Sequence, residues 1–308
     1  MFIGQSPETS RIKKMIREAG KTNDPVLIAG ETGSGKELAA REIHERSKQK
    51  NRPFVTLNCA AIGDTLDESD LFGATIEGPR GVERKIGLIE QAKKGIIYLE
   101  NLQDLNEVYQ QKFMNMISEK KYKQTSTQKI LDFDVRIIAA TTEMELGKNK
   151  SFRKDLLTAL NGFTINIPPL RKRKQDIPYL FMHFLKEFCD EFKNEIPSVP
   201  SDLFESLMEY EWHGNITELK NAVKNLVLMS PEGSLSVEYL PFEVIKHPFE
   251  YLVGKDLPEA VSEVESYLIR KSLQRFAGNQ TKAARALSVS EAALRYKMKK
   301  YGLSKKAF

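Results

Sequence analysis

The sequence predicts an α/β fold with a parallel sheet, followed by a small domain made only of helices. Short apolar, β-branched runs alternate with segments of helical period, these runs stop at a Pro-Pro pair, and the rest of the chain is helical. Runs without polar alternation are typical of strands that helices cover on both faces of a parallel sheet. At 308 residues, of which 41% are apolar, the chain is long enough for two domains.

The elements and domain boundaries follow from this pattern. The expected strands are residues 26–28, 54–57, 96–99, 135–139 and 163–167, and the expected helices after Pro168-Pro169 are about 177–192, 201–210 and 216–228. A segment rich in Pro and Gly reads as a linker before the last helices. The predicted domains are an α/β domain over 1–170, an α-helical lid over 171–232, a linker over 233–256 and a helical domain over 257–308.

A glycine-rich loop follows the first expected strand and precedes a helical stretch. Its GxxxxGK spacing, between a strand and a helix, is typical of a phosphate-binding loop (P-loop). The glycines let backbone amides wrap phosphates, the helix N-terminus adds positive charge, and Lys36 reaches the outer phosphates. We expect ATP or ADP here, and a turn without a ligand is the alternative. The candidate nucleotide-binding residues are Gly30, Glu31, Thr32, Gly33, Ser34, Gly35, Lys36 and Glu37, the last standing where Ser or Thr usually contacts Mg²⁺.

The strand expected at 96–99 ends in Glu100-Asn101, and these are the candidate catalytic residues. A P-loop ATPase needs one carboxylate to hold Mg²⁺ and another to orient the attacking water. Glu100 is the candidate ligand of a Mg²⁺ ion that the nucleotide also binds. Asn101 is neutral and cannot act as a base. Removing a general base costs on the order of 10² to 10⁴ in rate. The sequence therefore predicts nucleotide binding with weak or absent hydrolysis.

The C-terminal 31 residues have a strong excess of basic over acidic side chains. Residues 278–308 have a formal charge of +7, which leaves −2 for the rest of a chain whose net charge is +5. A basic end on a slightly acidic body is expected when one end meets a polyanion, and a solubilising tail is the alternative. The residue pattern in this end favours double-stranded DNA as the partner.

Two short helices separated by a turn predict a helix-turn-helix at this end. Gly278-Asn279 precedes the first helix, and Ser288 with Glu291 fits a capping box at the second, with Ser290 as the alternative cap. Ala283, Ala284 and Ala286 allow close approach, and Leu287, Val289, Leu294 and Met298 form the expected shared core.

The second helix of such a motif enters the major groove. Arg295 is the candidate for reading guanine, Ala292 and Ala293 for packing on thymine methyl groups, and Glu291 for accepting from cytosine. The candidates for phosphate contacts are Lys282, Lys297, Lys299 and Lys300, with Thr281 and Tyr296 as further DNA-binding candidates. The long helix expected before the motif predicts a dimer that reads a two-fold symmetric site.

Ordered matches along nearly the whole chain resemble the sigma-54-dependent activators, or bacterial enhancer-binding proteins. This family combines an AAA+ domain with a Fis-type DNA-binding domain. The resemblance implies ATP hydrolysis in an oligomeric, hexameric ring that remodels sigma-54 RNA polymerase. The matching segments are residues 2–6, 30–38, 54–61, 71–73, 87–92, 152–156, 167–171 and 212–215, with the Fis-type match at 278–303.

Several of the family's working residues are replaced. The polymerase-contacting GAFTGA loop corresponds to residues 74–81, which lack its Phe-Thr tip. The resemblance gives Asn58 the role of a switch that couples nucleotide state to a catalytic glutamate, and that glutamate is Asn101. Thr142 replaces the Asn of the first sensor, and Thr217 replaces the Arg of the second sensor. Of the two arginines that the family places at the subunit interface, Arg153 is kept and the other is Ala159.

Two functions therefore compete. One is a DNA-binding regulator that binds nucleotide but hydrolyses it poorly and does not drive sigma-54 promoters. The other is a working sigma-54 activator in which Asp104, Arg171 or Arg173 compensates for the lost groups. No apolar run is long enough to span a membrane and the first residues do not resemble a signal peptide, so we expect a cytoplasmic protein without a membrane partner.

Overall fold

A computed structural model describes residues 2–78, 81–125, 129–142, 151–230, 234–245, 252 and 254–303. The chain divides into two compact units, one formed by Met1–Phe184 with Glu211–Asn221 and the other by Leu185–Tyr210 with Ala222–Phe308. We describe each by itself. The predicted domain boundaries remain predictions.

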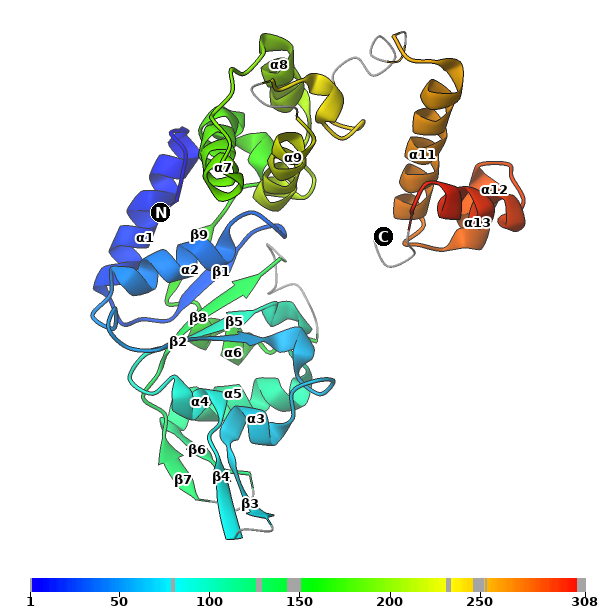
Figure 1. Cartoon of the computed structure of the whole chain (residues 1–308). Coiled ribbons are helices and arrows are strands. Elements are labelled where there is room, and N and C mark those ends of the chain that lie inside the picture. Colours follow the sequence, from blue (N-terminus) through cyan, green and yellow to red (C-terminus); the bar gives the residue numbers. More distant parts are fainter. Residues whose placement is uncertain are drawn as a thin grey trace. The chain divides into compact units, whose positions relative to one another are not determined.

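The first unit is built on a five-stranded parallel sheet in the order β2-β5-β8-β1-β9 (Figure 1). All five predicted strands are confirmed, with ends that differ by a residue or two. β1, β5 and β8 are almost wholly buried, as expected for strands that helices cover on both faces of a sheet. The strands are β1 (Val26–Ala29), β2 (Phe54–Asn58), β5 (Ile96–Glu100), β8 (Arg136–Thr141) and β9 (Phe163–Asn166).

Two apolar cores lie on opposite faces of this sheet. On one face, Val26 and Ile28 of β1 pack with Ile12 of α1 (Pro7–Lys21) and Ile43 of α2 (Lys36–Glu45). On the other, the neighbouring Leu27 joins a core with the helices drawn below the sheet in Figure 1. Those helices are α3 (Glu68–Phe72), α4 (Leu88–Gln91), α5 (Glu107–Glu119) and α6 (Lys154–Leu160).

Two antiparallel hairpins extend from this unit. One pairs β3 (Ala74–Gly78) with β4 (Gly81–Lys85), and the other pairs β6 (Lys121–Lys123) with β7 (Ile130–Asp132). Gly73 joins them, because its carbonyl accepts a hydrogen bond from the Thr125 amide at 3.2 Å. The sequence did not predict the first hairpin, which occupies the positions of the family's GAFTGA loop. Residues 79 and 80, at its turn, lie outside the described residues.

The helices after the Pro-Pro pair begin and end close to their predicted positions. They are α7 (Ile177–Phe192), α8 (Ser201–Glu209) and α9 (Asn215–Met229). Short 3₁₀ turns connect several elements: η1 (Cys59–Ala61), η2 (Leu102–Asp104), η4 (Leu170–Lys172), η5 (Lys174–Asp176) and η6 (Val237–Tyr239).

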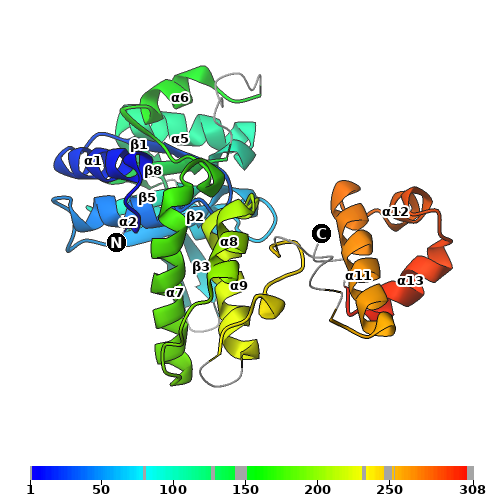
Figure 2. The same ribbon diagram turned by 90° about the horizontal axis from the view of Figure 1, so that it is seen from above.

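Three C-terminal helices of the second unit pack around their own small core. They are α11 (Leu257–Arg275), α12 (Gln280–Ala286) and α13 (Glu291–Lys300), and Figure 2 shows α12 and α13 beside α11. The core contains Ala283, Ala284, Leu294 and Met298, with Leu287 and Val289 packed against it, as predicted. Ala286 is exposed.

Candidate functional site

The P-loop connects the end of β1 to the start of α2. Gly33 and Gly35 have φ angles of +74° and +103°, which L side chains rarely adopt. A Cβ atom at Gly33 would lie 2.3 Å from the carbonyl oxygen of Gly214. The glycine spacing is therefore required by both the backbone conformation and the close approach of another segment.

Lys36 points back over the loop that precedes it. Its ammonium donates hydrogen bonds to the carbonyl oxygens of Gly30 at 2.8 Å and Glu31 at 3.0 Å. Burial lowers the pKa of Lys36, and the charge of Glu100 acts in the opposite direction. Lys36, at the start of α2, therefore lies close enough to Glu100, at the end of β5, to feel its charge.

The loop contains a buried hydroxyl that lacks a partner. Ser34 is 0% exposed, and its Oγ makes no hydrogen bond with the described residues. A buried polar atom of this kind calls for an explanation, and a ligand is one of them. The unsatisfied hydroxyl, the glycine cradle and the helix N-terminus together fit the phosphates of a nucleotide.

Glu31 links the P-loop to residues far along the chain. Its carboxylate accepts two hydrogen bonds from the Arg171 guanidinium, at 2.6 and 2.8 Å, and one from the Asn215 amide at 3.2 Å. These bonds, with that of Arg171 the largest, lower the pKa of Glu31 from 4.5 to about 2. Arg171 is therefore held by a carboxylate of the loop itself.

Arg173 lies behind the loop and is 1% exposed. Its Nη2 donates to the Ser34 carbonyl oxygen at 2.8 Å, and its guanidinium stacks over the Phe2 ring at 5.4 Å. Burial lowers the pKa of Arg173, although the charge of Asp176 acts against this shift. Since the guanidinium faces the loop's backbone from within the protein, it is a fixed positive charge beside the phosphate cradle.

Glu100 and Asn101 end β5 beside the end of β2. Asn101 adopts a left-handed backbone, φ 54° and ψ 49°, a conformation that Asn tolerates better than most residues. Its Nδ2 donates to the Asn58 Oδ1 at 3.1 Å. The two residues that the resemblance assigns to the switch and to the catalytic base are thus joined as two neutral amides.

Asp104 lies in η2, and its carboxylate accepts from the neighbouring Gln103 amide at 3.2 Å. Burial, followed by the charges of Asp104 and Glu100, raises the pKa of the Cys59 thiol to about 12. Asp104 therefore lies close enough to Cys59 for its charge to act on the thiol. It follows Asn101 in the sequence, at the end of η2. Cys59 is a free, buried cysteine.

The two sensor positions carry neutral hydroxyls. The backbone amide of Thr142 donates to Gln103 Oε1 at 3.2 Å, at the end of β8. Thr217 is exposed near the start of α9, and its Oγ1 would lie 3.0 Å from a Cβ atom at Gly33. Thr217 therefore adjoins the P-loop, but it brings no positive charge there.

Arg153 precedes α6 and is bound by its own surroundings. Its guanidinium forms a salt bridge with Asp155 at 2.5 Å and a hydrogen bond with Gln111. These contacts raise the pKa of Arg153, with the hydrogen bond to Asp155 as the largest cause. Ala159 lies on the same helix and is partly exposed.

The helix-turn-helix is formed by α12, a short turn and α13. The Ser290 hydroxyl accepts from the Ala293 amide at 3.1 Å and caps α13. The prediction of Ser288 as the cap is wrong, since Ser288 lies in the turn with φ 54°, and the alternative is confirmed. Asn279 caps α12 by accepting from the Lys282 amide at 3.0 Å.

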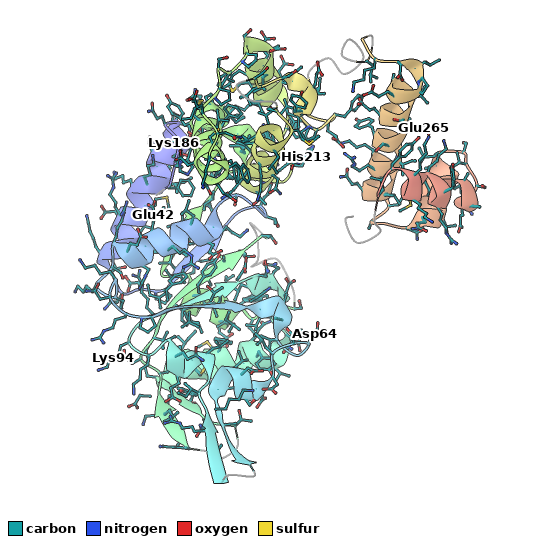
Figure 3. All side chains as sticks on the ribbon, viewed as in Figure 1. Glu42, Asp64, Lys94, Lys186, His213 and Glu265 are labelled. Atoms are coloured by element: carbon teal, nitrogen blue, oxygen red, sulfur yellow. The ribbon has the colours of Figure 1, made fainter. Side chains whose placement is uncertain are left out.

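Most of the DNA-binding candidates lie on open surfaces of α12 and α13. Arg295 forms long hydrogen bonds, both 3.3 Å, with Gln280 and Glu291. Lys297 is different, because its ammonium contacts Glu265 of α11 at 2.6 Å, where the Tyr301 hydroxyl also donates (Glu265 is labelled in Figure 3). The exposed candidates are Thr281, Lys282, Ala292, Arg295, Tyr296, Lys299 and Lys300, whereas Glu291, Ala293 and Lys297 are partly exposed.

The described part of the chain contains no helix long and apolar enough to cross a membrane. It also contains no cluster of three or more His, Cys, Asp or Glu side chains suited to a metal ion.

Three family models match successive parts of the chain. Residues 2–166 match the Sigma-54 interaction domain, 171–251 the AAA+ ATPase lid domain, and 260–301 the Fis family of bacterial regulatory proteins. Together they cover the α/β domain, the helices that follow it and the helix-turn-helix.

Characterised relatives match over almost the whole chain. The transcriptional regulatory protein ZraR of Escherichia coli is 34% identical over 96% of this chain and 68% of its own length. The transcriptional activator RocR of Bacillus subtilis is 33% identical over 98% of this chain and 68% of its own length.

A solved structure shares this architecture. The structure of NtrX from Brucella abortus in complex with ADP has a TM-score of 0.72 and 30% sequence identity, covering 98% of this chain and 69% of that one. The same protein in complex with ATP gives a TM-score of 0.71. The fold, the P-loop, the helix-turn-helix and these matches agree: the chain belongs to the family of sigma-54-dependent transcriptional activators, with a nucleotide-binding AAA+ domain and a DNA-binding helix-turn-helix.

Proposed function

We propose that this family member binds ATP or ADP with Mg²⁺ but hydrolyses ATP slowly or not at all, and that it regulates transcription through DNA binding. The observation that carries the proposal is the hydrogen bond between Asn101 and Asn58. An amide cannot accept the proton of an attacking water, so the base is missing where the fold would place it.

The nearby groups that could compensate for the lost ones are each held by other residues of the described structure, which supports the proposal. Asp104 is exposed and bonded to Gln103, Arg171 is bound to Glu31, and Arg173 is buried under the loop. Arg153, the arginine expected to act on a neighbouring subunit, is bound to Asp155. An arginine finger contributes roughly 10³ to 10⁵ in rate in related phosphoryl-transfer enzymes, so a bound or missing one is costly.

Contact with sigma-54 polymerase is the second activity that we propose to be impaired. The β3–β4 hairpin takes the place of the GAFTGA loop, but its sequence lacks the Phe-Thr pair. Nucleotide would then act as a structural or sensory ligand that sets the assembly state, with a hexameric ring as the assembly the family implies.

DNA binding by a dimer completes the proposal. Leu257, Val261 and Leu268 are exposed on α11 at helical spacing, with relative exposures of 76%, 46% and 47%. This apolar stripe fits a second copy of the same helix. The dimer would present two copies of α13 to a two-fold symmetric DNA site.

A promoter-opening assay with sigma-54 RNA polymerase tests the proposed function. The operator is first selected from random duplex DNA by the purified chain, then placed upstream of a sigma-54 promoter. We expect bound operator and no opened promoter with MgATP. Promoter opening that requires ATP would instead establish the working activator, and failure to select any sequence would remove the DNA-binding function.

A further inference from the structure

Glu265 of α11 is joined to the end of α13 by two hydrogen bonds. Its Oε2 accepts from the Lys297 ammonium at 2.6 Å and from the Tyr301 hydroxyl at 2.6 Å. Lys297 and Tyr301 are four residues apart, so they lie on one face of α13. The hydrogen bond from Lys297, followed by that from Tyr301, lowers the pKa of Glu265, because both stabilise its charged form. The carboxylate therefore connects α13 directly to α11.

The contacts of Glu265 add direction to the apolar packing of these helices. Apolar packing has little directional preference, whereas hydrogen bonds favour a narrow range of distances and angles. A second polar contact connects α11 to α12, because the buried Ser272 hydroxyl donates to the Ala283 carbonyl oxygen at 3.2 Å. Ser272 follows Glu265 by seven residues, or roughly 10 Å along the helix. Two separated polar contacts therefore orient the helix-turn-helix on α11.

Lys297 lies on a different side of α13 from Arg295, the candidate for reading a base. Residues two apart on an α-helix point in directions that differ by about 200°. The Arg295 side chain is 66% exposed and that of Lys297 is 31% exposed. Lys299 is exposed and lies four residues after Arg295, on the same face of the helix. Lys299 is therefore placed to meet DNA together with Arg295, whereas Lys297 faces α11.

We propose that Glu265, through Lys297 and Tyr301, sets the angle between α11 and α13 and thereby the half-site spacing that the dimer accepts. Paired copies of α11 would carry the two copies of α13, so this angle fixes the distance between them. Lys297 is then a positioning residue, and Lys299 makes the phosphate contact. The inference rests on the proposed function, because it requires a dimer that reads two-fold symmetric DNA.

Titrations of the full chain on operators whose half-sites are moved apart in single base-pair steps test this inference. Each step turns one half-site by roughly a tenth of a helical turn. We expect the unaltered chain to prefer one spacing by roughly tenfold. We expect Glu265→Ala to reduce this preference by roughly threefold or more, with the affinity for an isolated half-site unchanged.

The outcomes separate the inference from the proposed function. An equal preference in Glu265→Ala and the unaltered chain would overturn the inference and leave DNA binding intact. An unaltered chain that binds all spacings alike would remove the two-fold reading from the proposed function, and the inference with it.

A charge exchange tests whether the contact itself is responsible. Lys297→Glu places a second carboxylate beside Glu265, and we expect a weaker spacing preference. Adding Glu265→Lys restores an ion pair with reversed charges, and we expect the preference to return. Lys299→Glu is the matched control, which should weaken binding at every spacing alike. A folded double variant, by circular dichroism, that is no more selective than Lys297→Glu would contradict the role of the pair.

The salt dependence of binding to an isolated half-site separates positioning from phosphate contact. We expect Lys299→Gln to reduce the salt slope by about 1 and Lys297→Gln to leave it unchanged. A slope that falls by about 1 in Lys297→Gln would make Lys297 a phosphate contact and overturn its positioning role.

Discussion

Asn101 donates a hydrogen bond to Asn58 at 3.1 Å, and this contact ties together the ends of two neighbouring strands. The P-loop around Lys36 keeps its glycine geometry and its buried cation, Arg173. The P-loop thus has the geometry for binding phosphates, whereas the neighbouring pair of amides cannot accept a proton from an attacking water.

Restoring a carboxylate at position 101 should raise ATP turnover. Asp has the same length as Asn and also tolerates a left-handed backbone, so Asn101→Asp should preserve the fold. We expect an increase of roughly 10²-fold in phosphate release, the lower end of what a general base contributes. Asn58→Asp is the matched control, since it adds the same charge one strand away. Equal turnover in Asn101→Asp and the unaltered chain would show that the missing base is not what limits hydrolysis.

The bond between Glu31 and Arg171 should make stability depend on pH in the acid range. The pKa of Glu31 falls to about 2 in the folded protein from 4.5. A lowered folded-state pKa stabilises the protein above about pH 4.5, and this contribution is lost as pH falls toward 2. Because Glu31 is 39% exposed, we expect at most about 1 kcal/mol.

Urea unfolding of the unaltered chain and Glu31→Gln measures this contribution. The difference in unfolding free energy should be constant from pH 7 to 5 and shrink as pH falls below 4.5. A difference that does not change with pH over this range would show that Glu31 acts through packing and not through its charge.

Two substitutions on α13 should separate base reading from phosphate contact. We expect Arg295→Ala to cost about 1–3 kcal/mol and to relax sequence preference at one position of the operator. We expect Lys300→Ala to weaken binding to all sequences alike and to reduce the salt slope by about 1. Binding titrations at several salt concentrations, on the selected operator and on single-base variants, distinguish the two. If Arg295→Ala weakens every sequence equally, Arg295 holds phosphate.

The apolar stripe of α11 should hold the dimer together. Val261→Asp places a charge in this stripe, and we expect a monomer in analytical ultracentrifugation and loss of the two-fold operator preference. Gln274→Asp puts the same charge at another exposed position of α11 and should leave the dimer unchanged. A Val261→Asp protein that is still dimeric through its C-terminal domain would locate the interface elsewhere.

The sequence predicted the elements whose signals are local. All five sheet strands, the P-loop and the helix-turn-helix core follow from periodicity, glycine spacing and apolar positions. The β3–β4 hairpin was missed, because its strands are stabilised by pairing with each other, which a linear pattern does not reveal. Ser290 caps α13 and Ser288 does not, because the backbone of Ser288 adopts the left-handed conformation. The sequence does not reveal which of the two serines adopts that conformation.

Long-range contacts could not be predicted in this way. Glu31 meets Arg171 and Asn215 across separations of 140 and 184 residues, and nothing in the local sequence indicates these contacts. The partner of Lys297 was likewise hidden, since Glu265 lies 32 residues earlier on another helix. Such pairings follow from the packing of whole elements.

Phosphate release from MgATP, measured over a wide range of protein concentration beside a nucleotide-binding titration, tests the central claim most directly. We predict that nucleotide binds to the unaltered chain. We also predict that its phosphate release stays near background at every concentration and is no higher than that of Lys36→Ala. Turnover that rises with protein concentration and disappears in Lys36→Ala would contradict the account, because it would demonstrate a working ring.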